Sequence, residues 1–222
     1  MKNILVLAPH PDDEVLGAGG IIKKYSNAGI KVYVLVVTRG NPKYYSEEKI
    51  INVRQEARNS HAILGVKETV FLEFNAPDLD MTPKSEISKS ISKHIDKWKI
   101  TDLYVPHHGD IHIDHKIVFE AALVSARPKG NYTVKRIYAY ETLSETEWAH
   151  PFGHNAFVPT HFTDITDIFD FKIKALKCFK SQMRDFPDNR STECVEALAK
   201  FRGATVGLKR AEAFVVIRDI RN

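Results

Sequence analysis

The regular alternation of apolar runs with stretches of helical periodicity constrains the fold of this chain more than any other feature. The apolar runs predict strands at 3–8, 31–38, 69–74, 102–106 and 134–141. The amphipathic segments between them predict helices at 14–27, 47–64, 83–98 and 116–126. Because the strands are apolar on both faces, the pattern predicts an α/β, Rossmann-like fold, in which helices cover both faces of a mostly parallel β-sheet.

The last third of the chain is less regular. Its pattern predicts a loop at 143–160 and a strand at 161–166. Two helices, at 167–183 and 192–201, and a closing strand at 211–217 are predicted to follow. We see no internal repeat, low-complexity tract or linker, so we expect residues 1–222 to form a single domain. A loop as long as 143–160 is often functional, and the sequence leaves open whether it is a lid or a plain excursion.

Composition narrows the class of protein. The chain has 222 residues, of which 43% are hydrophobic and 27% charged, as in ordinary globular proteins. The net charge of +4 comes from basic residues scattered among acids, which does not favour a nucleic-acid partner. The two cysteines, Cys178 and Cys194, are typical of free thiols in a reducing compartment. Without a signal peptide or an apolar run of ~20 residues, we expect a cytoplasmic protein with no membrane span.

Two clusters of histidine and acid each follow a predicted strand and precede a predicted helix. The segment "HPDDE" starts at residue 10, and "HHGDIHIDHK" spans 107–116. They hold five of the ten histidines, namely His10, His107, His108, His112 and His115. Ligands of open α/β sheets bind outside the carboxyl ends of the strands, so we expect both clusters to meet there. Since imidazole and carboxylate together suit zinc and related ions, the sequence predicts a metal site at the C-terminal ends of the strands.

A nucleotide site is the second interpretation of the first loop. The segment "GAGG" at 17–20 lies in the first predicted helix, and helix N-termini bind phosphate groups. The GxGxxG spacing is absent, however, and the acids Asp12, Asp13 and Glu14 would repel a phosphate. We therefore favour the metal site.

The same residues carry a resemblance to a known family. "APHPDDE" together with "HIDH" resembles the two signature motifs of the LmbE-like (PIG-L type) zinc-dependent N-acetylglucosamine deacetylases. Four more segments resemble family blocks in the same order: "RQEARNSHAILGV", "FTDIT", "KIKALKCFKSQ" and "AEAF". The resemblance thus spans nearly the whole chain.

The resemblance implies a set of metal ligands and a base. It assigns His10, Asp13 and His115 to zinc and makes Asp12 the general base that activates a metal-bound water. Three protein ligands leave an open position for that water. A site of two histidines and one aspartate also accepts ferrous iron or another divalent metal.

The resemblance also implies roles around the metal. His112 would stabilise the oxyanion or protonate the leaving amine, and Asp114 would orient His112, raise its pKa and keep it charged. Arg54 would contact substrate hydroxyls, unless it is an ordinary helix-surface arginine. For Asp110, a role behind the ligands and a turn position are both open, and for Glu14 we favour a structural role.

The expected function is a metal-dependent hydrolase that removes the N-acetyl group from an N-acetylglucosamine-type amino sugar conjugate. The partner implied is a small N-acetylated amino sugar, and the resemblance is also compatible with a homo-oligomer, trimer or hexamer. One alternative is hydrolysis of a different amide, such as a natural-product or cell-surface glycan precursor, by the same metal site. The other is a non-enzymatic sugar- or metal-binding module, which the presence of both Asp12 and His112 disfavours.

Overall fold

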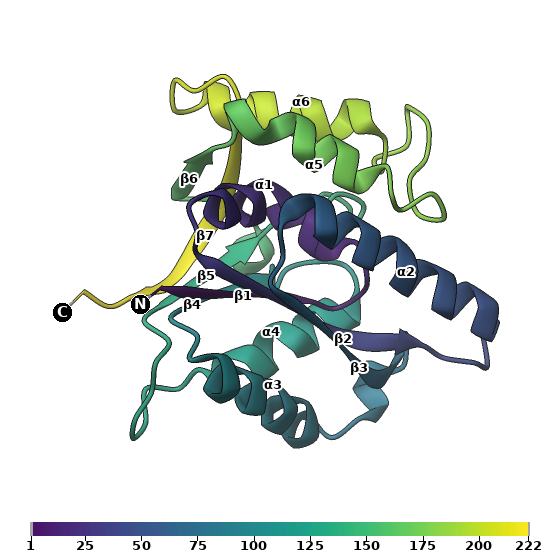
Figure 1. The fold of residues 1–222 in the computed structure, drawn as a ribbon, viewed down its shortest axis with the longest axis vertical. Coiled ribbons are helices and arrows are strands. Elements are labelled where there is room, and N and C mark those ends of the chain that lie inside the picture. Colours follow the sequence, from purple (N-terminus) through teal and green to yellow (C-terminus); the bar gives the residue numbers. More distant parts are fainter. Residues whose placement is uncertain (1, 222) are drawn as a thin grey trace.

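The computed structural model describes residues 2–221, and its apolar runs form the seven strands of one sheet (Figure 1). The strands are β1 (Asn3–Ala8), β2 (Lys31–Gly40), β3 (Glu68–Ala76), β4 (Asp102–Pro106), β5 (Arg136–Tyr140), β6 (His161–Asp164) and β7 (Ala211–Asp219). The α-helices are α1 (Asp13–Asn27), α2 (Glu47–Leu64), α3 (Lys84–Trp98), α4 (Ile113–Ser125), α5 (Phe169–Leu176) and α6 (Thr192–Ala204). Short 3₁₀ turns are η1 (Leu79–Met81), η2 (Gly153–Asn155) and η3 (Thr166–Ile168).

The sheet is mostly parallel, as the sequence predicts. Its strand order is β3-β2-β1-β4-β5-β7-β6, and the pairs from β3 through β5 are all parallel. The closing strand β7 runs antiparallel to both β5 and β6. The antiparallel edge adds β6 and β7 without a further parallel crossover, and the fold class is confirmed.

Helices cover both faces of the sheet, which is also confirmed (Figure 1). Alternate residues of β1 point to opposite sides: Ile4 and Val6 pack in the core under α1, α2, α5 and α6, whereas Leu5 and Leu7 pack in the core over α3 and α4. All four side chains are fully buried, which explains why the strand reads as a continuous apolar run. Within residues 2–221, no helix is both long and apolar enough to span a membrane.

One predicted helix is shorter in the structure than in the prediction. The segment 167–183 forms η3 and then α5, which ends at Leu176. Beyond it, the backbone N–H and hydroxyl of Ser181 both donate to the carboxylate of Glu56 in α2, at 3.1 and 2.6 Å. These bonds hold the chain in turns against α2, where the sequence pattern predicts further helix.

The glycines of "GAGG" serve close packing of α1. A Cβ at Gly17 would lie 2.2 Å from the ring of Tyr140 in β5, and a Cβ at Gly20 would lie 2.9 Å from the carboxylate of Glu212 in β7. Only glycine lets the helix approach the sheet this closely. The segment that first suggested a phosphate loop is therefore explained by the packing of α1.

Candidate active site and metal centre

The topology brings the two histidine-rich loops side by side. β1 and β4 are parallel neighbours in the sheet, so the loops that follow them leave the same edge. The first loop ends at Asp12, the N-cap of α1, and the second ends at His112, the N-cap of α4. Asp12 has a left-handed backbone with φ of 117°, which is unusual for a residue with a side chain.

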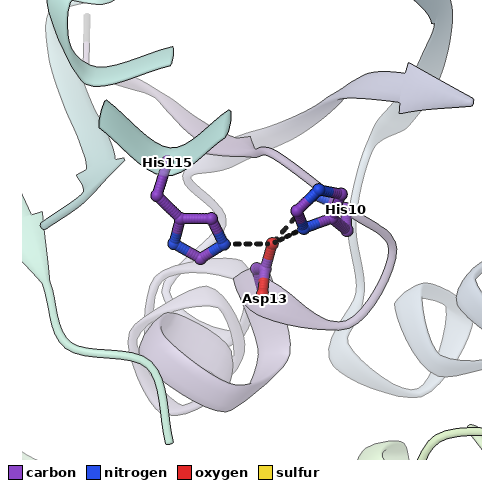
Figure 2. A group of neighbouring side chains, drawn as sticks. All are labelled: His10, Asp13 and His115. Carbon is purple, nitrogen blue, oxygen red and sulfur yellow. Dashed lines mark hydrogen bonds and ion pairs between the residues drawn. The ribbon is translucent and has the colours of Figure 1, made fainter. Parts of the chain in front are cut away.

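The three predicted metal ligands lie close together (Figure 2). Ligand atoms of His10, Asp13 and His115 all lie within 4.8 Å of one another. Asp13 Oδ2 is 3.3 Å from His10 Nδ1 and 3.3 Å from His115 Nε2, and it also accepts the backbone N–H of His10 at 2.8 Å. The structure thus brings together the side chains that the resemblance assigns to zinc.

This group fits a divalent cation. Asp13 Oδ1 and His115 Nε2 are buried and have no hydrogen-bond partner among residues 2–221. Leaving a buried polar atom unsatisfied costs about 1–3 kcal/mol, so such atoms call for a ligand. His115 Nδ1 lies 2.8 Å from Asp110 Oδ2 and carries the proton, because a carboxylate only accepts. In the neutral imidazole, which is the form that binds metals, the lone pair of His115 Nε2 therefore faces the centre.

A second group shares one member with the first. His10, His112 and Asp114 also place ligand atoms within 4.8 Å. In this group, the buried atom without a partner among residues 2–221 is Asp114 Oδ1. His10 Nε2 lies 3.0 Å from Asp114 Oδ2, and His112 Nδ1 accepts the backbone N–H of Asp114 at 3.1 Å. The first group, with two unsatisfied atoms, fits a metal better.

Charges at the centre are strongly coupled. Burial opposes the charged form of His10, but hydrogen bonds to Asp114 and Asp13 outweigh it and raise the pKa of His10 to about 9. Burial likewise opposes charge on Asp13, and yet the neighbouring His115 and His10 hold the pKa of Asp13 well below its usual value. Because histidine binds metals as neutral imidazole, a metal ion binding here would release protons.

Asp12 lies beside the group and lines a cavity of about 310 Å³. Burial raises the pKa of Asp12 to about 7, although the guanidinium of Arg190 acts in the opposite direction. Arg190 Nη1 donates to Asp12 Oδ2 at 2.6 Å. A carboxylate with a pKa near neutrality on the wall of a cavity is suited to proton transfer. The base role of Asp12 stays a prediction.

Asp114 contacts a different histidine from the one we expected. Its Oδ2 lies 3.0 Å from His10 Nε2 but 3.9 Å from His112 Nδ1, so the carboxylate orients His10. The pKa of His112 also moves against the expectation. Burial lowers the pKa of His112 to about 4, and the charge on His10 adds to this, which together exceed the opposing effect of Asp114. This direction is opposite to the shift that we expected from Asp114, and the role of His112 stays a prediction.

The remaining predicted residues have clear positions. Asp110 lies behind His115, one of the predicted ligands, so its carboxylate contacts the candidate metal group. Glu14 binds His61 at 2.7 Å and accepts the backbone N–H of Asp12 at 3.2 Å, contacts that fit the structural role. Arg54 lines the cavity, where it donates to Glu73 at 2.7 Å, and its contact with substrate stays a prediction.

Two further residues at the site are missed by the sequence analysis. Arg190 comes from the segment between α5 and α6, 178 positions from its partner Asp12. Glu145 lies in the 143–160 loop and lines the same cavity, and burial raises its pKa to about 7. Neither belongs to a motif quoted above, and no local pattern marks either as a site residue.

The fold and the site define an α/β protein with a candidate metal-dependent active site at the carboxyl edge of its sheet. Residues 5–126 match the family described as PIG-L: GlcNAc-PI de-N-acetylase. The match covers more than half of the chain, and the protein belongs to this PIG-L/LmbE-like deacetylase family.

Individual relatives agree with the family assignment. The uncharacterized deacetylase YaiS of Escherichia coli (strain K12) is 31% identical over an alignment of 188 positions that covers 81% of this chain and 91% of YaiS. Diacetylchitobiose deacetylase of Thermococcus kodakarensis is 30% identical over an alignment of 234 positions that covers 99% of this chain and 85% of that protein. The solved structure of N,N'-diacetylchitobiose deacetylase from Pyrococcus horikoshii, in complex with an inhibitor, has a TM-score of 0.77 at 26% identity, covering 98% of this chain and 84% of that one.

Proposed function

We propose that this protein is a metal-dependent N-deacetylase that cleaves the N-acetyl group from an N-acetylglucosamine-type amino sugar conjugate. One observation carries the proposal: Asp13 and His115, each with a buried and unsatisfied atom, converge with His10 beside a cavity that Asp12 and His112 line. Such a site places the ligands for a metal beside a cavity that also holds a base and a hydrogen-bond donor. Metal-assisted hydrolysis of an amide uses all three.

Zinc is the metal that we propose, held by His10, Asp13 and His115. Two imidazoles and one carboxylate are a ligand set of catalytic zinc sites, and ferrous iron suits the same donors. When bound, a divalent ion would polarise the acetyl carbonyl and lower the pKa of the attacking water.

Asp12 accepts the proton of the attacking water. Its neighbour Asp13 is a ligand, so the Asp12 carboxylate lies close to the centre, on the wall of the cavity. Arg190 occupies Asp12 Oδ2 and leaves Oδ1 for the water. With a pKa of about 7, Asp12 is ionised in part of the molecules at neutral pH and can both take up and return a proton.

His112 stabilises the charge that develops on the acetyl oxygen. Its Nδ1 accepts the backbone N–H of Asp114, so the neutral ring carries its proton on Nε2. That N–H serves as a donor toward the cavity that His112 lines. Removing one donor of this kind typically lowers turnover by about 10²–10³.

The cavity and the relatives support an amino sugar as the substrate. Apolar side chains of Tyr45, Ile50 and Val53 line the cavity together with the polar Arg54 and Arg39, a mixture that suits a sugar with apolar ring faces and hydroxyl groups. The Thermococcus relative is named for a diacetylated disaccharide of glucosamine. A different amide remains the second candidate, because it would use the same metal, base and donor.

The test is amine release from a panel of N-acetylated compounds by zinc-loaded protein. The panel holds N-acetylglucosamine, N,N'-diacetylchitobiose, N-acetylglucosaminyl malate, a nucleotide-linked N-acetylglucosamine and an N-acetylated amino acid. Asp12→Asn tests the base, and Asp80→Asn, which changes an exposed residue of η1, is the matched control. Metal content is measured for every sample.

We expect at least one amino sugar to be deacetylated, with turnover about 10²–10⁴-fold lower in Asp12→Asn and unchanged in Asp80→Asn. Turnover of the amino acid alone would overturn the substrate class and support the second candidate. Full activity of Asp12→Asn would overturn the base assignment.

A further inference from the structure

The side chain of Arg190 reaches two other segments at the rim of the site and a second residue of its own segment. Its Nη1 donates to Asp12 Oδ2 at 2.6 Å, and its Nε donates to the hydroxyl of Ser144 at 2.8 Å. Nη1 also lies 3.4 Å from Gln182 Oε1, and Nη2 lies 4.0 Å from Glu145 Oε1. The guanidinium therefore ties together the loop after β1, the loop after β5 and the segment between α5 and α6.

Two of its partners have strained backbones. Among residues 2–221, three residues other than glycine have positive φ: Asp12 at 117°, Ser144 at 72° and Lys99 at 51°. Lys99 is the C-cap of α3, where a left-handed residue is ordinary. Asp12 and Ser144 both bind Arg190. Backbone strain of this kind costs about 1–3 kcal/mol and persists only where surrounding contacts enforce it.

We propose that Arg190 is the positioning residue of Asp12, holding the strained loop and aiming one carboxylate oxygen at the cavity. The proposal rests on the proposed function, because it concerns the group assigned as the base. The planar guanidinium is fixed through Nε by Ser144, so the direction of Nη1 is set before it meets Asp12. Among residues 2–221, Arg190 engages Oδ2 of Asp12 and no residue engages Oδ1, which is left for the attacking water.

Simple anchoring of the loops is the competing explanation, and the chain offers a control for it. The neighbouring side chain of Asn189 donates to Glu147. This bond joins the segment between α5 and α6 to the loop after β5 and does not involve Asp12. Asn189→Ala therefore weakens the attachment of the loops and leaves the contact between Arg190 and Asp12 in place. An effect confined to Arg190 variants separates positioning from anchoring.

The experiment compares kcat and KM of the zinc-loaded wild type with Arg190→Lys, Arg190→Gln, Asn189→Ala, Asp12→Asn and the double variant Arg190→Gln/Asp12→Asn. We expect Arg190→Gln to lower kcat about 10- to 100-fold, since misplacing a catalytic group costs on the order of 10²-fold. KM should change less than about threefold, because an effect on the base alone leaves ground-state binding intact. Arg190→Lys, which keeps the charge but not the fork, should fall between wild type and Arg190→Gln.

The double variant shows whether Arg190 acts through Asp12. If it does, Arg190→Gln/Asp12→Asn is no slower than Asp12→Asn, because residues that act as a unit are not additive. Additive losses, or a rise in KM with kcat unchanged, would overturn the proposal and make Arg190 a substrate-binding residue. An equal loss of kcat in Asn189→Ala would assign the effect to loop anchoring.

A crystal structure of zinc-loaded Arg190→Gln tests the same contact without turnover, and a thermal melt shows whether each variant folds. We expect the Asp12 carboxylate to turn away from the position that it has in the wild type, while the metal and its ligands stay. An unmoved Asp12 would overturn the proposal. If the wild type deacetylates nothing in the panel, the proposed function fails, and the crystal structure still decides whether Arg190 positions Asp12.

Discussion

Replacing Asp110 by asparagine should weaken metal binding without changing any ligand. Asp110 is fully buried and uses both oxygens: Oδ2 accepts from His115 Nδ1 at 2.8 Å, and Oδ1 accepts from the hydroxyl of Thr146 at 2.6 Å. Asparagine has nearly the same shape but only one acceptor oxygen, so it can satisfy one of these donors and presents an NH₂ group to the other. It also removes the negative charge behind His115.

The size of the effect follows from these contacts. Losing the carboxylate partner of a histidine ligand typically lowers metal affinity by about 10- to 100-fold, or roughly 1.4–2.7 kcal/mol. Titrating zinc against a chromophoric chelator gives the Kd for wild type and Asp110→Asn. Thr146→Val is the matched control, because it removes the other donor to Asp110 but leaves the bond to His115. Its Kd should stay within about threefold of the wild-type value.

Two results would refute this reasoning. A zinc Kd for Asp110→Asn within twofold of wild type, in a protein with a normal thermal melt, would show that Asp110 does not prepare His115 as a ligand. Equal weakening by Thr146→Val would mean that the loop, and not the histidine partner, controls the affinity.

Further predictions concern stability and metal dependence. Lys172→Met removes the 2.7 Å ion-pair partner of the buried carboxylate of Glu212 and should lower the free energy of unfolding in urea by about 3–5 kcal/mol. Lys200→Met removes an exposed ion pair and should lower it by at most about 1 kcal/mol. Equal losses would contradict the role of burial. Gly17→Ala places a Cβ 2.2 Å from the ring of Tyr140 and should cost about 1–3 kcal/mol by overpacking, and an unchanged melt would refute that tight packing. Zinc at a hundred times its Kd should raise Tm by about 5–11 °C in calorimetry, from roughly 2.7 kcal/mol of binding free energy, and a chelator should abolish the gain. No shift with zinc would argue against the site.

The sequence predicts that the three candidate metal ligands lie together. His10 and Asp13 lie in one short motif and His115 in another, each directly after an apolar run that forms a buried strand. Because β1 and β4 are parallel neighbours, two such motifs meet at one edge, and pattern together with topology suffices to expect the convergence. The sequence leaves open that Asp110 lies behind His115, since a spacing of five residues does not fix which ring nitrogen faces which group.

Local patterns determine the strands, most helix boundaries and the two loops that carry the histidines, because burial on a sheet or a helix face has a period that a short window reveals. Only the tertiary structure decides that Arg190 meets Asp12, that Asp114 binds His10, and that the 167–183 helix stops at Leu176. These contacts join residues far apart in the chain, or depend on the direction of single side chains. The periodicity of the sequence shows neither kind of contact. The charge states of the site residues depend on burial and on neighbouring groups, which are in place only once the sheet has brought the loops together.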